Sequence, residues 1–288
     1  MTPAGRDVSR DDLICAHFTL GGVDGTVGLE QRAAAAAEGG FRYIGWLGDA
    51  YTTERAAGRS DADIKAILDH HGVAVAELEF LWGWATAGDP GFDWREQEST
   101  LFALADLVGA RHVNCGDVAL AGTMLPLDEV VERFAGICDR AADHGLLAGI
   151  EFLPWSGIPD AGVAWEIARR AGRANGGVQI DTWHYFRGAA DPRQLEAIPP
   201  ERVILIQLDD AGPAQGDQME DTSYRRRLPG EGEFDLVGFL QLLDDRGVTA
   251  PISVEVMSTE LAGLPPATVA KRVYDAAAST VARARTPR

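Results

Sequence analysis

The sequence predicts a single (β/α)8 barrel that spans residues 1–288. The length suits one such barrel, which usually has about 250 residues before insertions. Eight short apolar, β-rich runs alternate along the chain with longer segments of helical periodicity, and this alternation is typical of a parallel sheet covered by helices. No linker rich in Pro, Gly or Ser divides the chain, so we expect one domain.

The expected strands are spread evenly along the chain. They begin at Leu13, Phe41, Val73, Ala110, Leu146, Val178, Val203 and Pro251. Eight evenly spaced units favour a closed barrel over the alternative, a doubly wound open sheet. No Gly-x-Gly-x-x-Gly pattern follows the first strand, so the dinucleotide-binding fingerprint is missing.

Helical segments are expected between these strands, and the clearest are residues 28–40, 60–72, 127–145, 234–247 and 265–284. The first two end in glycine, a common C-terminal cap, and the second begins at the capping residue Ser60. Residues 211–233 form the longest irregular stretch. Long loops in compact domains are usually functional lids or disordered insertions.

Composition excludes several classes of protein. The net charge of −18 disfavours a nucleic-acid partner and an anionic membrane surface, because both would repel the chain. Three cysteines without a Cys-x-x-Cys pair argue against a disulfide framework and favour a reducing compartment. No apolar run has transmembrane length, and the first residues lack the apolar core of a signal peptide. We therefore expect a cytoplasmic protein.

One polar residue interrupts each of the last four apolar runs, near the C-terminal end where barrel active sites lie. These residues are Glu151, Asp181, Gln207 and Glu255. Buried carboxylates are costly unless they are paired or bind a metal ion, and no arginine or lysine lies in those strands to balance them. The pattern predicts one divalent ion, with Mn2+ expected and Mg2+ or Co2+ as alternatives. Hydrogen bonding within the barrel is the competing interpretation of each residue.

Further polar and aromatic residues fall near the same strand ends. His184, just after Asp181, is interpreted as an acid/base group or a substrate contact, with helix capping as the alternative. The tryptophans near these ends can stack on a sugar ring or pack between loops. One arginine of residues 225–227 could clamp a carboxylate or hydroxyl groups. The expected substrate contacts are Trp46, Trp82, Trp155, Trp183, Glu79, Asn114 and Arg226.

Five segments of the second half of the chain resemble the sugar phosphate isomerase/epimerase superfamily, the xylose isomerase-like barrels. The segments are GIEFLPW, QIDTWHYFRG, ILIQLDDA, LPGEGEFD and PISVEV. The resemblance implies metal ligands at Glu151, Asp181, Gln207 and Glu255. Ketose 3-epimerases of the superfamily typically have histidine at the third position. Gln207 is instead similar to the hydroxypyruvate isomerase and 3-dehydroshikimate dehydratase groups.

The resemblance implies an isomerase or epimerase that acts on a sugar or sugar-like hydroxy-ketone through an enediolate held on the metal. Glu151 and Glu255 would remove and return the proton. One alternative is a dehydratase of a cyclic keto-acid or keto-polyol, of the 3-dehydroshikimate or inosose type, with His184 as the acid. Another is a subunit of a heteromeric C-glycoside lyase. The expected partners are a small polyol, sugar or keto-acid, and barrels of this kind often form homo-oligomers.

Overall fold

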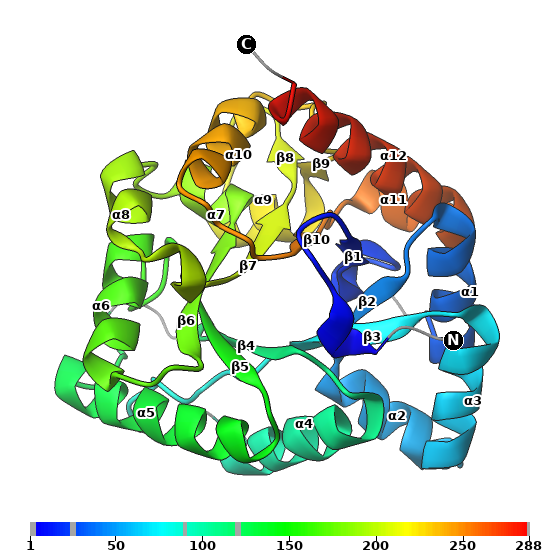
Figure 1. Cartoon of the computed structure of the whole chain (residues 1–288), viewed down its shortest axis with the longest axis horizontal. Coiled ribbons are helices and arrows are strands. Elements are labelled where there is room, and N and C mark those ends of the chain that lie inside the picture. Colours follow the sequence, from blue (N-terminus) through cyan, green and yellow to red (C-terminus); the bar gives the residue numbers. More distant parts are fainter. Residues whose placement is uncertain (1–3, 24–26, 89–90, 119–121, 287–288) are drawn as a thin grey trace.

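Eight parallel strands close into a barrel in the computed structural model, which describes residues 4–23, 27–88, 91–118 and 122–286 (Figure 1). The strands are hydrogen-bonded in the order β1-β10-β7-β6-β5-β4-β3-β2. Their bounds are Leu13–Cys15 (β1), Tyr43–Leu47 (β2), Ala74–Glu79 (β3), His112–Gly116 (β4), Leu147–Glu151 (β5), Gly176–Asp181 (β6), Val203–Leu208 (β7) and Ile252–Val254 (β10). All eight expected strands are therefore confirmed, and the fold is a (β/α)8 barrel.

The longer helices surround the sheet (Figure 1). They are α1 (Leu29–Gly39), α2 (Gly48–Ala56), α3 (Asp61–His71), α4 (Trp94–Val108), α5 (Leu127–Asp143), α6 (Ala161–Ala171), α10 (Leu236–Asp245) and α12 (Pro266–Ala284). Shorter helices are α7 (Thr182–Arg187), α8 (Pro192–Ala197), α9 (Gln218–Tyr224) and α11 (Thr259–Ala262), with 3-10 turns at Gly5–Asp7, His17–Thr19 and Pro200–Arg202. The five clearest helices of the sequence are confirmed. The Ser60 side chain caps α3 as expected, since it accepts a hydrogen bond from the backbone N of Asp63.

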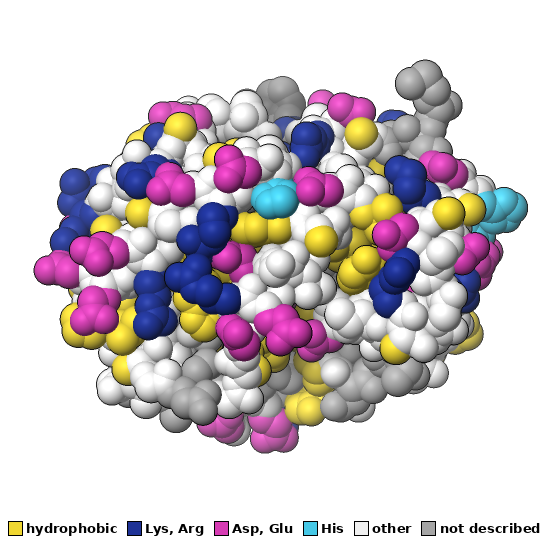
Figure 2. Space-filling model, turned by 90° about the horizontal axis from the view of Figure 1, so that it is seen from below, with side chains coloured by type: hydrophobic (Ala, Val, Ile, Leu, Met, Phe, Trp, Pro, Cys, Tyr) yellow, Lys and Arg dark blue, Asp and Glu magenta, His cyan; other side chains and the backbone are white. Residues whose placement is uncertain are grey.

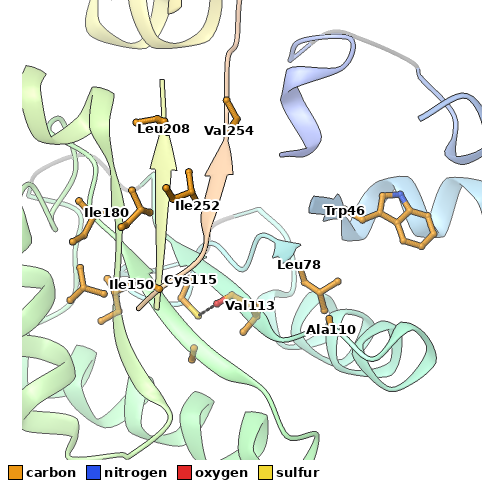
Figure 3. Packing of buried hydrophobic residues seen from close by; sticks show 14 of the residues in the cluster. Trp46, Leu78, Ala110, Val113, Cys115, Ile150, Ile180, Leu208, Ile252 and Val254 are labelled. Atoms are coloured by element: carbon orange, nitrogen blue, oxygen red, sulfur yellow. Dashed lines mark hydrogen bonds between the residues drawn. The ribbon is translucent and has the colours of Figure 1, made fainter. Parts of the chain in front are cut away.

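The hydrophobic core lies between the strands and this helical layer. Figure 3 shows part of it, including Ile150, Ile180 and Leu208 from consecutive strands. The outer surface over α4 and α5 carries acidic and basic side chains close together (Figure 2). Between these two helices, Arg140 pairs with the buried Glu98 at 2.7 Å. No helix in the described ranges is long and apolar enough to cross a membrane.

The stretch 211–233, expected to be irregular, contains helix α9 and a two-stranded sheet of β8 (Asp210–Ala211) and β9 (Arg226–Arg227). The buried Asp210 carboxylate organises its end, because it accepts hydrogen bonds from the backbone N of Gly230, Gly232 and Phe234 at 2.9–3.1 Å. This segment is therefore a hydrogen-bonded, structured part of the barrel mouth. The pairing of β8 with β9 sets the position of Arg226.

Polar side chains gather inside the barrel, and one glycine provides the room. A Cβ atom added to Gly45 on β2 would lie 2.3 Å from Oε1 of Glu79 and 3.2 Å from Oε2 of Glu77. Any larger residue would displace one of these two carboxyl groups. Buried carboxyls thus occupy the part of the interior near the mouth, whereas a separate apolar cluster that includes Ile14, Tyr43 and Leu205 lies nearer the N-terminal ends of the strands.

Candidate active site

Glu151, Asp181 and His184 come together at the C-terminal ends of β5 and β6. Potential ligand atoms of these three buried side chains all lie within 4.8 Å of one another. His184 Nε2 is 3.5 Å from Glu151 Oε1. The local sequence explains the arrangement, because Asp181 caps helix α7 and its Oδ1 accepts a hydrogen bond from the backbone N of His184 at 3.0 Å. One carboxylate thus serves as helix cap and as a candidate metal ligand.

Glu255 is joined to Asp181 by a buried arginine. Arg226 Nη1 donates to Asp181 Oδ2 at 2.7 Å and to Glu255 Oε2 at 3.2 Å, and it also contacts Asp209 Oδ2. Its Nε donates to the carbonyl oxygen of Thr222 at 3.1 Å. No arginine or lysine lies in the four strands, but Arg226 reaches these carboxylates from β9, in the loop that follows β7. Asp209 was missed, although the double aspartate of ILIQLDDA was visible.

The three arginines of residues 225–227 differ in their surroundings. Arg226 is 1% exposed and faces the carboxylates, whereas Arg225 pairs with Glu220 near the surface. Arg227 donates to the backbone carbonyl of Glu231. The structure therefore identifies Arg226 as the arginine of the site.

Burial and charge move the site's pKa values in different directions. Burial raises the pKa of Glu255 well above its ordinary value, an effect that Arg226 opposes and nearby Glu79 and Glu151 reinforce. Burial also raises the pKa of Asp209. For Asp181, burial acts in the same direction, but the charges of Arg226 and His184 outweigh it and the pKa is lowered. Burial thus disfavours the ionised forms of Glu255 and Asp209, and opposing charges outweigh burial at Asp181.

Gln207 lies beside Asp181 in the register of β6 and β7. Its Nε2 donates to Glu77 Oε1 at 3.4 Å, and its buried Oε1 meets no hydrogen-bond partner in the described part of the chain. The same holds for Oδ1 of Asn114, whose Nδ2 donates to Glu151 Oε2 at 2.6 Å. A buried oxygen without a donor is costly unless a cation or water meets it. Carboxylate and amide oxygens are hard donors of the kind that divalent ions prefer. Among the described residues, however, the acidic and histidine side chains that could share one ion are Glu151, Asp181 and His184, and the expected ligand Glu255 is not in that group.

A cavity of about 300 Å3 opens above these residues. Its polar lining includes Glu79, Asn114, Glu151, His184, Arg226 and Glu255, which sequence analysis had selected. Its apolar lining includes Trp82 and Trp155, also selected, together with Phe18, Phe80, Leu153 and Met257, which were missed. The four missed residues are apolar, so no polar side chain within an apolar run marked them as site residues in the sequence.

Trp46 and Trp183 do not line this cavity, contrary to expectation. Gly45 faces the barrel interior, so its neighbour Trp46 points the other way (Figure 3). The Trp46 ring packs edge-on against Tyr51, at 5.8 Å between ring centroids. Trp183 is fully buried and contacts the rings of Trp155 and His184, at 6.1 and 5.4 Å between centroids. Trp183 therefore packs against Trp155 and His184, two residues that do line the cavity.

Relatives with named activities match about half of the chain. A 3-dehydroshikimate dehydratase of Pseudomonas aeruginosa is 35% identical over 130 residues, which are 45% of this chain and 20% of that protein. An inosose isomerase of Halalkalibacterium halodurans is 25% identical over 149 residues, 51% of this chain and 52% of that protein. The matched segments thus span between one fifth and about half of these relatives.

Solved structures extend the likeness to nearly the whole chain. The IolI protein, solved with a bound zinc atom, superposes with a TM-score of 0.84 at 18% identity and covers 96% of this chain and 100% of its own. At that identity the likeness concerns the fold. The profile of one family matches residues 33–278, more than half of the sequence. The chain belongs to the xylose isomerase-like TIM barrel family, whose relatives here include dehydratases and isomerases.

Proposed function

We propose that the chain is a divalent-metal-dependent isomerase or epimerase of a cyclic polyhydroxy ketone without a phosphate group. The observation that carries the proposal is the pair Glu151 and Glu255, two buried carboxyl groups on non-adjacent strands that line one cavity. Two such groups suit removal of a proton from a carbon and its return elsewhere.

The ligands we propose are Glu151, Asp181, Gln207 and Glu255. His184 is a further candidate, because its ring lies within 4.8 Å of ligand atoms of Glu151 and Asp181. We propose Mn2+ as the ion, with Mg2+ and Co2+ as alternatives; the zinc named for IolI makes Zn2+ a further ion to test. When bound, such an ion acts as a Lewis acid that polarises a substrate carbonyl and acidifies the adjacent C–H.

Each proposed acid–base residue has one anchored oxygen. Asn114 holds Oε2 of Glu151, and Arg226 holds Oε2 of Glu255. The anchoring bonds fix the two side chains and leave Oε1 of each for the substrate or the ion. One carboxylate would take the proton next to the carbonyl, which leaves an enediolate, and the other would return it.

The cavity lining supports a substrate with an apolar ring face and no phosphate. Aromatic walls suit the C–H face of a ring, and Trp82 and Trp155 provide them. Among described lining residues Arg226 alone is cationic, and acidic neighbours already occupy it. Residues 24–26, 89–90 and 119–121, which the structure does not describe, contain no Lys or Arg. A phosphate would therefore meet little counter-charge.

A dehydratase is the second candidate, favoured by His184 and by the dehydratase relative. His184 lines the cavity next to Glu151, where it could protonate a departing hydroxyl after Glu151 or Glu255 has taken the α-proton. Both reactions share their first step, so the outcome depends on whether a hydroxyl lies next to the carbanionic carbon.

Proton exchange in deuterated water tests the proposal. Protein loaded with Mn2+ is incubated with inosose and, separately, with 3-dehydroshikimate, while NMR follows the C–H signals and absorbance follows any new chromophore. Exchange with formation of an isomer is the expected result, and water loss with a new ultraviolet band would assign the dehydratase instead. Metal-loaded protein that exchanges no proton with either ketone would refute both and favour a chain that needs a partner subunit. E151Q provides the inactive control.

A further inference from the structure

A second buried carboxyl group, that of Glu77 on β3, lies one layer closer to the N-terminal ends of the strands than the candidate metal site. It is fully buried. Its Oε2 accepts a hydrogen bond from Ser253 Oγ at 2.6 Å, and its Oε1 accepts from Nε2 of Gln179 and of Gln207, both at 3.4 Å. Four strands thus contribute side chains to one polar cluster inside the barrel.

The contact with Glu77 decides which way the Gln207 amide faces. The oxygen and nitrogen ends of an amide have nearly the same shape, so its direction is set by its hydrogen-bond partners. Glu77 Oε1 accepts from both glutamine amides while Ser253 occupies Oε2, so the NH2 end of Gln207 faces it. The amide oxygen then points away from Glu77, and it is the buried atom without a partner among the described residues.

We propose that Glu77 is a positioning residue that holds the oxygen of the Gln207 amide toward the bound divalent cation. The proposal rests on the metal site proposed above. In the reversed orientation, two N–H groups with partial positive charge would face the cation, and the site would lose one of its four oxygen donors. Groups behind the ligands of metal sites orient them in this way, and their loss typically weakens metal affinity 10–100-fold.

Gln179 supplies a matched control within the same cluster. Its Nε2 makes the same 3.4 Å bond to Glu77 Oε1, and its own Oε1 also lacks a partner in the described ranges. It stands two residues before Asp181 on β6, in the lower layer, and is not a proposed ligand. Removal of either glutamine or of Glu77 disturbs the same buried cluster, but only Glu77 and Gln207 should affect the metal.

Metal affinity of the stripped protein is the direct test, measured by equilibrium competition with a chelator for Mn2+. We expect E77M to weaken affinity about 10–100-fold and Q179M about threefold at most. E77Q should stay within about threefold of the natural protein, because its amide oxygen accepts the same bonds and its nitrogen donates to Ser253 Oγ. Unchanged affinity in folded E77M would overturn the proposal, as would an equal loss in Q179M.

A double-mutant cycle keeps the test decisive if E77M does not fold. Q207E sets a carboxylate against Glu77, so E77Q should raise metal affinity about tenfold or more in the Q207E background while leaving it nearly unchanged in the natural one. An equal effect of E77Q in both backgrounds would show that the two side chains are uncoupled.

The two proposals fail in distinguishable ways. Metal binding that weakens in E151Q and E255Q but not in E77M leaves the proposed metal site intact and removes only the role of Glu77. A natural protein whose metal binding does not depend on Glu151 or Glu255 would remove the metal site, and the role of Glu77 with it.

Discussion

Arg226 is the only described side chain that binds Asp181, Asp209 and Glu255 at once, and its replacement by methionine gives the sharpest test of the electrostatics. Methionine keeps an apolar stem of similar reach but removes the charge. In the absence of metal, the three buried carboxyl groups would then face one another without a counter-ion.

The expected loss follows from the burial of the whole cluster. Arg226 and its two aspartate partners are at most 1% exposed, and removal of one partner from a buried ion pair costs about 3–5 kcal/mol. For a chain somewhat longer than 250 residues, each kcal/mol shifts the melting temperature by about 2–4 °C. R226M should therefore lower the melting temperature of the metal-free protein by roughly 10 °C.

Thermal unfolding in chelator and in excess Mn2+ provides the assay. A bound ion supplies the missing positive charge, so Mn2+ should stabilise R226M more than it stabilises the natural protein, provided that binding persists. R225M is the matched control, because Arg225 is the adjacent arginine but pairs with Glu220 at the surface, where such a pair contributes about 1 kcal/mol or less.

Equal melting temperatures for R226M and R225M in chelator would refute the reasoning. That result would mean that the carboxyl groups take up protons at no cost when the guanidinium is lost. A large loss that Mn2+ does not reduce would instead locate the effect in the contacts of Arg226 with the loop, such as its bond to Thr222.

Three further perturbations test separate parts of the site. E151Q and E255Q should each lower turnover by about 10²–10⁴-fold with unchanged circular dichroism, and near-normal turnover in either would remove that residue from acid–base chemistry. The raised pKa of Glu255 means that the folded metal-free protein keeps a proton that the unfolded chain loses near pH 4.5. The stability of the metal-free protein should therefore fall as pH rises above that value. Metal binding should release protons, and calorimetry in two buffers of different ionisation enthalpy detects the release as a buffer-dependent heat. Proton uptake on metal binding would contradict this prediction. G45A should lower the free energy of unfolding by about 1–3 kcal/mol, because the added Cβ meets the Glu79 carboxyl group. G263A is the control, because its Cβ would lie 3.9 Å from the nearest neighbour and should leave stability unchanged. Equal melting temperatures for the two variants would exclude crowding at Gly45.

Periodicity was sufficient to predict the barrel and the strand ends that form its mouth. A polar residue inside an apolar run is conspicuous, so Glu151, Asp181, Gln207 and Glu255 could be selected from sequence. Alternation along the strands and the barrel's known polarity then place such residues near one another. Arg226 could be named only as one of three adjacent arginines, since its inward direction depends on the pairing of β9 with β8.

Side-chain direction was the information that sequence lacked. Trp46 follows Gly45 on β2, and successive residues of a strand point to opposite faces, so only one of the two can face the interior. A slip of one residue reverses every side chain of a strand, so strand position alone could not separate Trp46 from Trp82. Glu77 was not predicted, because it lies below the barrel mouth and site residues were expected only at the C-terminal ends of the strands.

The interior of this barrel is difficult to explain as a stabilising core. Six carboxyl groups are buried around the site, those of Glu77, Glu79, Glu151, Asp181, Asp209 and Glu255. Arg226 contacts three of them directly, and burial raises the pKa of Glu77, Glu79, Asp209 and Glu255. Apolar residues of similar volume would hold the same strands together at lower cost. The excess of buried carboxyl groups over the guanidinium of Arg226 therefore supports a function in which a doubly charged cation completes the site.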